Sequence, residues 1–250
     1  MAMHSPLEQF EIKTLVPFQA FGHDLSFTNA SLFMILSLMA ATLLLTAGLG
    51  RGSLIPTRWQ MLTETLYQTI SNMVDSVAGN KARPYFPFIF TLFIFIMMGN
   101  MLGLVPGAFT FTSHLVVTFA LSALVFLVVT ITGFARHGLH FLHLFVPAGT
   151  PLALMPIMFV IELFSFFIRP FSLAIRLFAN MLAGHILLKV FAGLAIMLIG
   201  GLGAIGYGVA ILPVIMNIFM IGFEFFVAAL QAYIFAILAS VYLRDALEMH

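Results

Sequence analysis

The 250-residue chain contains no cysteine, and only 8% of its residues are charged. The absence of cysteine excludes a disulfide framework, a thiolate nucleophile and a metal site with thiolate ligands. A soluble domain has about 25% charged residues, so this charge content excludes an ordinary soluble fold. Ten basic and nine acidic residues leave a formal charge of +1. Nucleic acid is therefore excluded as a partner, because its binding proteins carry a clustered basic surface.

Apolar residues dominate the chain, at 62% of the total, and the mean hydropathy is +1.13. Residues 25–50 and 84–135 contain no Asp, Glu, Lys or Arg, and a membrane-spanning helix needs about 20 apolar residues. We therefore predict an all-α polytopic membrane protein with about five membrane helices and one interfacial amphipathic helix. The predicted segments are an outer N-terminal segment (1–28), a first span (29–49), a cytoplasmic interfacial segment (50–84), a two-span hairpin (85–135), a cytoplasmic connection (136–156) and a long tilted helical hairpin (157–247).

The last two apolar segments are unusually long, at roughly 157–191 and 212–247, with a glycine-rich stretch at 200–206 between them. A helix of about 35 residues is about 52 Å long, whereas the hydrocarbon core of a bilayer is about 30 Å thick. We therefore expect a strongly tilted helical hairpin, for which Pro170 supplies a bending point.

The orientation follows from the basic residues, because loops rich in Lys and Arg stay in the cytoplasm. Four of them lie in the 50–84 segment, and Arg136 and Arg244 are placed on the same side. The opposite side has Lys13 and, at its edge, Lys189. The N-terminus is predicted to be outside and the C-terminus inside.

Ionisable and amide side chains cluster in the long hairpin, where insertion of a charge costs at least about 2.5 kcal/mol. A spacing of seven residues falls 20° short of two full helical turns, so it keeps side chains on one face. Two stripes have this spacing: Glu162, Arg169 and Arg176 in the first segment, and Asn217, Glu224 and Gln231 in the second. His185, nine residues after Arg176, is expected on a different side of its helix. These stripes make the hairpin the candidate site.

Arg176 cannot carry protons itself, because a guanidinium keeps its proton at any accessible pH. It can hold a nearby carboxylate ionised: the attraction is about 4 kcal/mol at about 4 Å and an effective dielectric near 20. Glu162, His185 and Glu224 are groups that burial can tune for a relay. The simpler alternative is buried hydrogen bonding between helices, which stays open for Ser172, Asn180 and Asn217. For Arg169 we favour snorkelling towards the interface.

The segment Arg169-Pro-Phe-Ser-Leu-Ala-Ile-Arg-Leu-Phe-Ala-Asn-Met-Leu-Ala-Gly-His185 resembles the signature of the subunit a family of F-type ATP synthases. Phe-Glu-Phe-Phe-Val-Ala-Ala-Leu-Gln-Ala-Tyr-Ile-Phe at 223–235 is similar to the family's second motif. Further similarities are Ser-Pro-Leu-Glu-Gln-Phe-Glu-Ile at 5–12 and Gly-Asn-Met-Leu-Gly-Leu-Val-Pro at 99–106. The resemblance covers nearly the whole chain.

The resemblance implies a proton-translocating stator subunit that is not catalytic alone. It implies two half-channels to the carboxylates of a c-ring, with the essential charge of Arg176 between them. The outer half-channel would involve Asn180, His185, Glu224 and Gln231, with Asn217 on the same stripe, and Glu162 would lie towards the inner one. The implied partners are the c-ring, the peripheral stalk b subunits, the lipid bilayer and protons, with no cofactor. The implied location is a bacterial inner membrane, with the mitochondrial inner membrane as second choice.

Two other functions use the same residues. A proton-coupled secondary transporter could use Glu162, Arg176 and Glu224 as a substrate site. A haem-binding electron carrier would need paired axial histidines, and only His114 and His185 lie in predicted spans. Three further histidines, at 137, 140 and 143, have no carboxylate nearby, which favours a solvated connection over a metal site.

Overall fold

The computed structural model describes residues 10–20, 23–24, 26–48, 57–105, 107–145 and 154–248. Several features of the sequence analysis lie outside the described residues: positions 5–9 of the N-terminal motif, Arg51, Pro106 and residues 146–153 of the predicted connection. The side chain of His143 is also outside the description.

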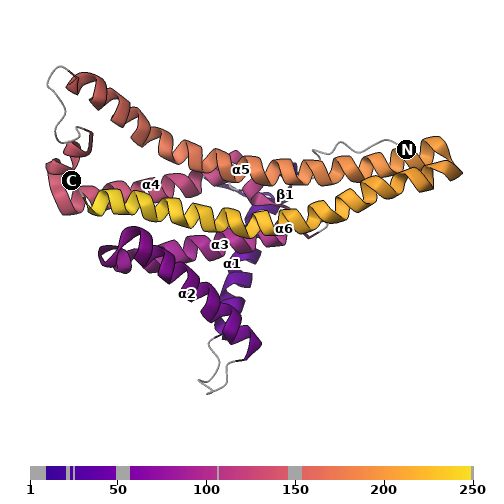
Figure 1. The fold of residues 1–250 in the computed structure, drawn as a ribbon, viewed down its shortest axis with the longest axis horizontal. Coiled ribbons are helices and arrows are strands. Elements are labelled where there is room, and N and C mark those ends of the chain that lie inside the picture. Colours follow the sequence, from indigo (N-terminus) through magenta and orange to yellow (C-terminus); the bar gives the residue numbers. More distant parts are fainter. Residues whose placement is uncertain are drawn as a thin grey trace. The chain divides into compact units, whose positions relative to one another are not determined.

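Within these ranges, five helical segments are long and apolar enough to cross a membrane. They are α1 (Asn29–Gly48), the segment Asn80–Gly103 that contains α3 (Phe86–Gly103), α4 (Leu115–His137), α5 (Met155–Leu202) and α6 (Ala204–Leu247) (Figure 1). The prediction of an all-α polytopic membrane protein is therefore confirmed. Long apolar helices suit a bilayer because they satisfy all their backbone groups internally.

The N-terminal segment contains four short strands that the sequence analysis did not predict. β1 (Thr14–Val16) pairs with β4 (Phe27–Thr28), and β2 (Gln19–Ala20) pairs with β3 (His23–Asp24), both antiparallel. Asn29 connects this segment to α1, because its Oδ1 accepts from the backbone N–H groups of Lys13 (3.1 Å) and Ala30 (2.9 Å). The side-chain cap of α1 is Thr28, whose Oγ1 accepts from the backbone N–H of Ser31 at 3.4 Å.

The amphipathic helix is α2 (Arg58–Ala78), which begins after Thr57, whose Oγ1 accepts from the backbone N–H of Gln60. Ile70, Val74 and Ala78 recur at intervals of four and are buried, as one face of a helix requires. A short 3-10 helix, η2 (Asn80–Tyr85), leads into α3. The position of α2 at a membrane interface remains a prediction.

The chain forms two compact units, each assembled from distant segments. The first comprises Met1–Thr42, Phe95–His114 and Phe178–Gln231, and the second comprises Leu43–Ile94, Leu115–Leu177 and Ala232–His250. In the first unit, Phe111 of the short helix η3 (Phe111–Ser113) is fully buried beside Gly99, where a Cβ would clash with its ring. In the second unit, Ala236 and Ser240 of α6 are fully buried. The Ser240 hydroxyl donates to Ala236 O at 2.8 Å, and its oxygen lies 3.6 Å from Met73 Sδ of α2.

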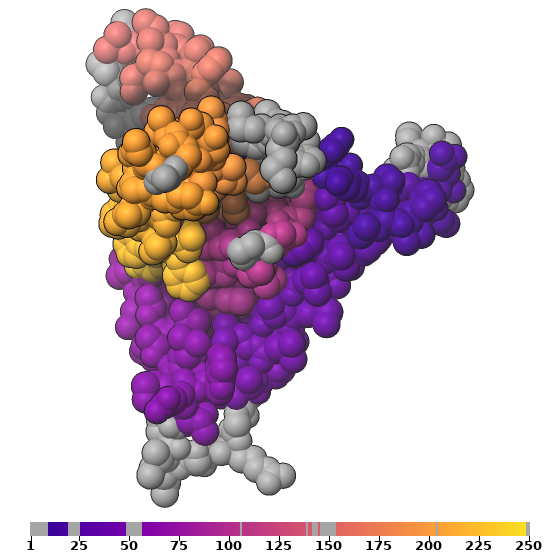
Figure 2. Space-filling model, turned by 90° about the vertical axis from the view of Figure 1, so that its right-hand side faces the viewer, coloured from indigo at the N-terminus to yellow at the C-terminus, as the bar shows by residue number. Residues whose placement is uncertain are grey.

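The hairpin of α5 and α6 is longer than the sequence analysis predicted, with 48 and 44 residues. Instead of a glycine-rich break over 200–206, both helices continue to a turn at Gly203, which has φ +54°. This closed end is at the surface in Figure 2, in orange. Gly206 allows close packing there, because a Cβ would clash with Leu198 O. At 1.5 Å per residue, α5 is about 72 Å long. The tilt of the hairpin in the membrane stays a prediction.

Candidate functional site

In the first unit, α5 and α6 run antiparallel and bring His185 and Glu224 together. His185 Nε2 lies 3.8 Å from Glu224 Oε1, and the two residues are 8% and 2% exposed. The distance is longer than a hydrogen bond, so an approach of about 1 Å would allow direct proton transfer. The two residues that the sequence analysis paired from different helices are therefore neighbours.

Gly184, directly before the histidine, makes this proximity possible. A Cβ at position 184 would lie 2.5 Å from Glu224 Oε1 and 2.8 Å from its Cδ. Side-chain atoms do not approach so closely, so any other residue here would displace the carboxyl group. Glycine at position 184 thus leaves room for the Glu224 carboxyl group beside the histidine.

Several buried polar atoms on α6 have no hydrogen-bond partner within the described part of the chain. They are both carboxylate oxygens of Glu224, Asn217 Oδ1 and Gln231 Nε2. All three residues belong to the stripe that the heptad spacing predicted. Burial of an unpaired polar group is costly, so each such group in a native protein needs an explanation.

A side-chain hydrogen bond across the hairpin in this unit joins two amides. Asn180 Nδ2 donates to Gln231 Oε1 at 2.8 Å, with Asn180 exposed and Gln231 2% exposed. This bond runs between the two helices, from Asn180 on α5 to Gln231 on the stripe of Glu224. The bond is consistent both with a packing role and with a place in a polar pathway.

The connection between α3 and α4 supplies residues that the sequence analysis missed. Thr110 Oγ1 lies 2.9 Å from His185 Nε2, and Thr112 Oγ1 donates to Asn100 Oδ1 at 2.8 Å. Asn100 Nδ2 in turn donates to the backbone oxygen of Ala228 on α6 at 3.2 Å. The cluster of hydroxyl residues at 110–113 within an apolar region was the available signal in the sequence.

In the second unit, Arg176 and Glu162 lie on α5. Arg176 is exposed and Glu162 is half-buried. The Arg176 guanidinium forms no ion pair with any residue that the structure describes. Other exposed residues of α5 include the apolar Phe171 and Ile175, each more than 50% exposed. The polar Ser172 and Asn180, one helical turn before and after the arginine, are also exposed. Arg176 is therefore accessible to a carboxylate from outside this part of the chain.

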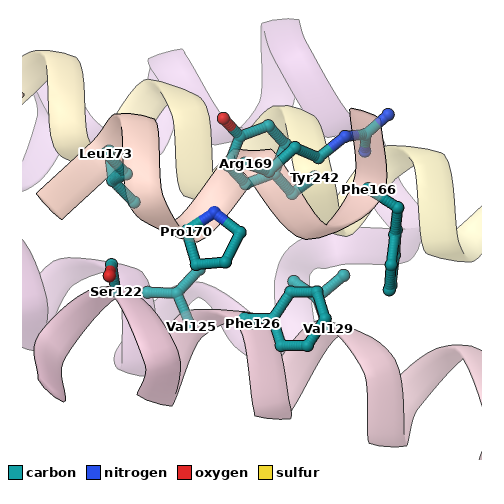
Figure 3. Close-up of a pocket in the computed structure, with 9 residues that line it drawn as sticks. All are labelled: Ser122, Val125, Phe126, Val129, Phe166, Arg169, Pro170, Leu173 and Tyr242. Carbon is teal, nitrogen blue, oxygen red and sulfur yellow. The ribbon is translucent and has the colours of Figure 1, made fainter. Parts of the chain in front are cut away.

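Arg169, by contrast, has partners on α6 that the sequence analysis did not predict. Its Nη1 donates to Asp245 Oδ2 at 2.9 Å, and its guanidinium lies 5.2 Å from the ring centre of Tyr242. Figure 3 shows Arg169 and Tyr242 beside a small recess, with Pro170 facing Val125 of α4. The arginine therefore joins α5 to α6 instead of extending alone towards an interface.

The fold and the site define a polytopic α-helical membrane protein with ionisable residues buried between its longest helices. A family model described as "ATP synthase A chain" matches residues 30–244. The chain belongs to this family, and the resemblance stated from its sequence is confirmed.

Curated relatives match over nearly the full length. The chain is 52% identical over 243 residues to ATP synthase subunit a of Parvibaculum lavamentivorans, covering 97% of this chain and 93% of that protein. It is 50% identical over 248 residues to ATP synthase subunit a of Rhodospirillum rubrum, covering 99% and 100%. It is 48% identical over 247 residues to ATP synthase subunit a of Pelagibacter ubique, covering 98% of each chain.

Proposed function

We propose that the chain is the proton-translocating stator subunit of a rotary ATP synthase. The observation that carries the proposal is the buried pair of His185 and Glu224, together with the family to which the chain belongs. A histidine and a carboxyl group this close titrate as one site. Such a site can accept a proton from one side and release it to the other, as a relay must.

The outer half-channel is formed by the polar residues of the hairpin in the first unit. His185 and Glu224 exchange the proton, while Asn180, Gln231 and Asn217 provide hydrogen-bonding groups along the path. The unpaired buried atoms on α6 support this assignment, because a pathway needs polar atoms that are not already satisfied. Glu162 of the second unit belongs to the inner half-channel.

Arg176 is the stator charge that faces the carboxylates of the c-ring. Its exposure and the many exposed apolar residues of α5 support this role, because a rotor of apolar helices packs against a mainly apolar surface. A permanent cation keeps a passing carboxylate ionised until it reaches the next half-channel. It also repels protons, so it separates the two half-channels electrostatically.

The assembly follows from this role. The partners are the c-ring, the peripheral stalk b subunits, the bilayer and protons. The location is a bacterial inner membrane, with the N-terminus outside and the 50–84 segment in the cytoplasm. Because the chain has no cysteine, Ile12→Cys and Met61→Cys would report the orientation. We expect a membrane-impermeant thiol reagent to label position 12 from outside and position 61 from the cytoplasm; the opposite pattern would overturn the orientation.

An exchange of the two paired residues tests the proposed function. Passive proton flux is measured through the membrane sector after the catalytic head is removed, for His185→Glu, Glu224→His and the double variant. Each single change should reduce the flux severely, and the double exchange should restore part of it because both groups are present again. If the double variant conducts no better than the worse single variant, the two residues do not act as a pair.

A further inference from the structure

The connection that follows α3 approaches His185 closely. Thr110 Oγ1 lies 2.9 Å from His185 Nε2, and the same hydroxyl lies 3.2 Å from the backbone oxygen of Gly103. Thr110 is 4% exposed. The hydroxyl therefore lies between two different partners. Gly103 O can only accept a hydrogen bond, whereas His185 Nε2 donates or accepts, depending on whether it carries a proton.

The hydrogen count of this arrangement determines which atom donates. A threonine hydroxyl has one hydrogen, so it cannot donate to Gly103 O and to His185 Nε2 at once. While it donates to Gly103 O, Nε2 must carry a proton and donate to Thr110 Oγ1. This protonated nitrogen also lies 3.8 Å from Glu224 Oε1.

The position of the hydroxyl is fixed by α3. A Cβ at position 103 would lie 2.5 Å from Thr110 Oγ1, so glycine is required where the threonine packs. One turn earlier, Gly99 accommodates the ring of Phe111 in the same way. Asn100 lies between them, bonded to Thr112 and to the backbone of α6. The Gly99-Asn-Met-Leu-Gly103 part of the sequence thus forms a platform for the 110–113 segment.

We propose that Thr110 is a positioning residue for His185, and that its hydroxyl changes hydrogen-bond partner as the histidine loses its proton. When the Glu224 carboxylate moves within hydrogen-bond distance, the Nε2 proton of the imidazolium leaves Thr110 Oγ1 and passes to the carboxylate. The ring becomes neutral, with its remaining proton on Nδ1, and the carboxylate becomes a carboxylic acid. Nε2 is then an acceptor, and the Thr110 hydroxyl turns from Gly103 O to donate to it. Both states of the ring keep the same orientation towards Glu224.

This inference rests on the proposed function, since it assumes that His185 conducts protons. It is tested with the assembled membrane sector in vesicles, by passive proton flux per complex after removal of the catalytic head. Thr110→Val keeps the shape but removes the hydroxyl, and Thr110→Ser keeps the hydroxyl. We expect about a tenfold lower flux in the valine variant, the factor that corresponds to loss of one buried hydrogen bond. The serine variant should stay within about twofold of the wild type.

Thr118→Val is the matched control, because Thr118 is also fully buried but its hydroxyl donates to Leu115 O of its own helix. It should conduct normally. Normal flux in Thr110→Val, or equal losses in the serine and valine variants, would overturn the proposal. If the valine variant fails to assemble, Thr110→Ala is compared with Thr110→Ser, and equal flux in these two would refute it. His185→Leu distinguishes a failure of the Thr110 proposal from a failure of the proposed function. Normal flux in that variant would refute the proposed function itself.

Discussion

The substitution Gly184→Ala tests the geometry of the proton site with a single methyl group. The added Cβ would lie 2.5 Å from Glu224 Oε1, 2.8 Å from Cδ and 3.2 Å from Cγ. An ordinary contact needs about 3.4 Å or more, so the carboxyl group must move by about 1 Å. Because Glu224 is only 2% exposed, it has little free space to move into.

This displacement would change the distance between His185 Nε2 and Glu224 Oε1, which at 3.8 Å is already longer than a hydrogen bond. A misplacement of about 1 Å can reduce the rate of a positioned reaction by about a hundredfold. We therefore expect passive proton flux through the membrane sector to fall by about ten- to a hundredfold in Gly184→Ala, with normal assembly. Proton-driven ATP synthesis in vesicles should fall in parallel.

Gly193→Ala is the matched control, because it lies on the same helix with no atom within 4 Å of the added Cβ. Alanine has a higher helix propensity than glycine by about 1 kcal/mol, so this variant should be as stable as the wild type or slightly more so. Normal flux in Gly184→Ala would refute the reasoning, because it would show that the carboxyl position does not limit proton transfer. Equal losses in both glycine variants would refute it too.

Two further predictions concern ion pairs of the second unit. Two hydrogen bonds from Arg83, each 3.1 Å, lower the pKa of the Asp75 carboxyl in the folded state. The pair therefore stabilises the fold at a pH above the pKa of an aspartate in the unfolded chain. This stabilisation is lost as the pH falls through the pKa of Asp75 in the folded state. The difference in thermal unfolding midpoint between wild type and Asp75→Asn should accordingly vanish in acid, and a difference that grows in acid would contradict this. For Arg169 and Asp245, both about a quarter exposed and 2.9 Å apart, a double-mutant cycle with Arg169→Met and Asp245→Asn should give a coupling energy of about 1–3 kcal/mol in unfolding experiments; a value near zero would show that the pair does not stabilise α5 against α6.

The membrane helices could be predicted from the sequence because the apolar composition leaves few alternatives. Two errors have physical causes. The glycines at 200 and 201 were expected to interrupt the helix, but a helix satisfies its own backbone, and in an apolar setting this outweighs the low propensity of glycine. The strands near Thr14 are only two or three residues long, too short for an alternating pattern to be recognised.

The sequence predicted which residues form the candidate site, but only some of the contacts between them. The spacing of seven placed Glu224 on a polar stripe, yet its neighbours depend on the register of the hairpin, which is set by the turn at Gly203. The Thr110 contact was missed because it comes from a connection whose path no periodicity specifies. Asp245 was missed as the partner of Arg169 because charged residues at helix ends are usually solvated.

The central claim is that Arg176 acts as the stator charge, and coupled ATP synthesis in vesicles tests it most directly. Arg176→Ala and Arg176→Lys are compared with Ser172→Ala, a change one helical turn earlier at another exposed position of α5, and the subunit content of each complex is checked. The account predicts assembled complexes without measurable synthesis in both arginine variants, because neither an uncharged side chain nor a compact ammonium replaces a permanently charged planar group. The serine variant should synthesise ATP normally. Near-normal synthesis by Arg176→Ala would contradict the account.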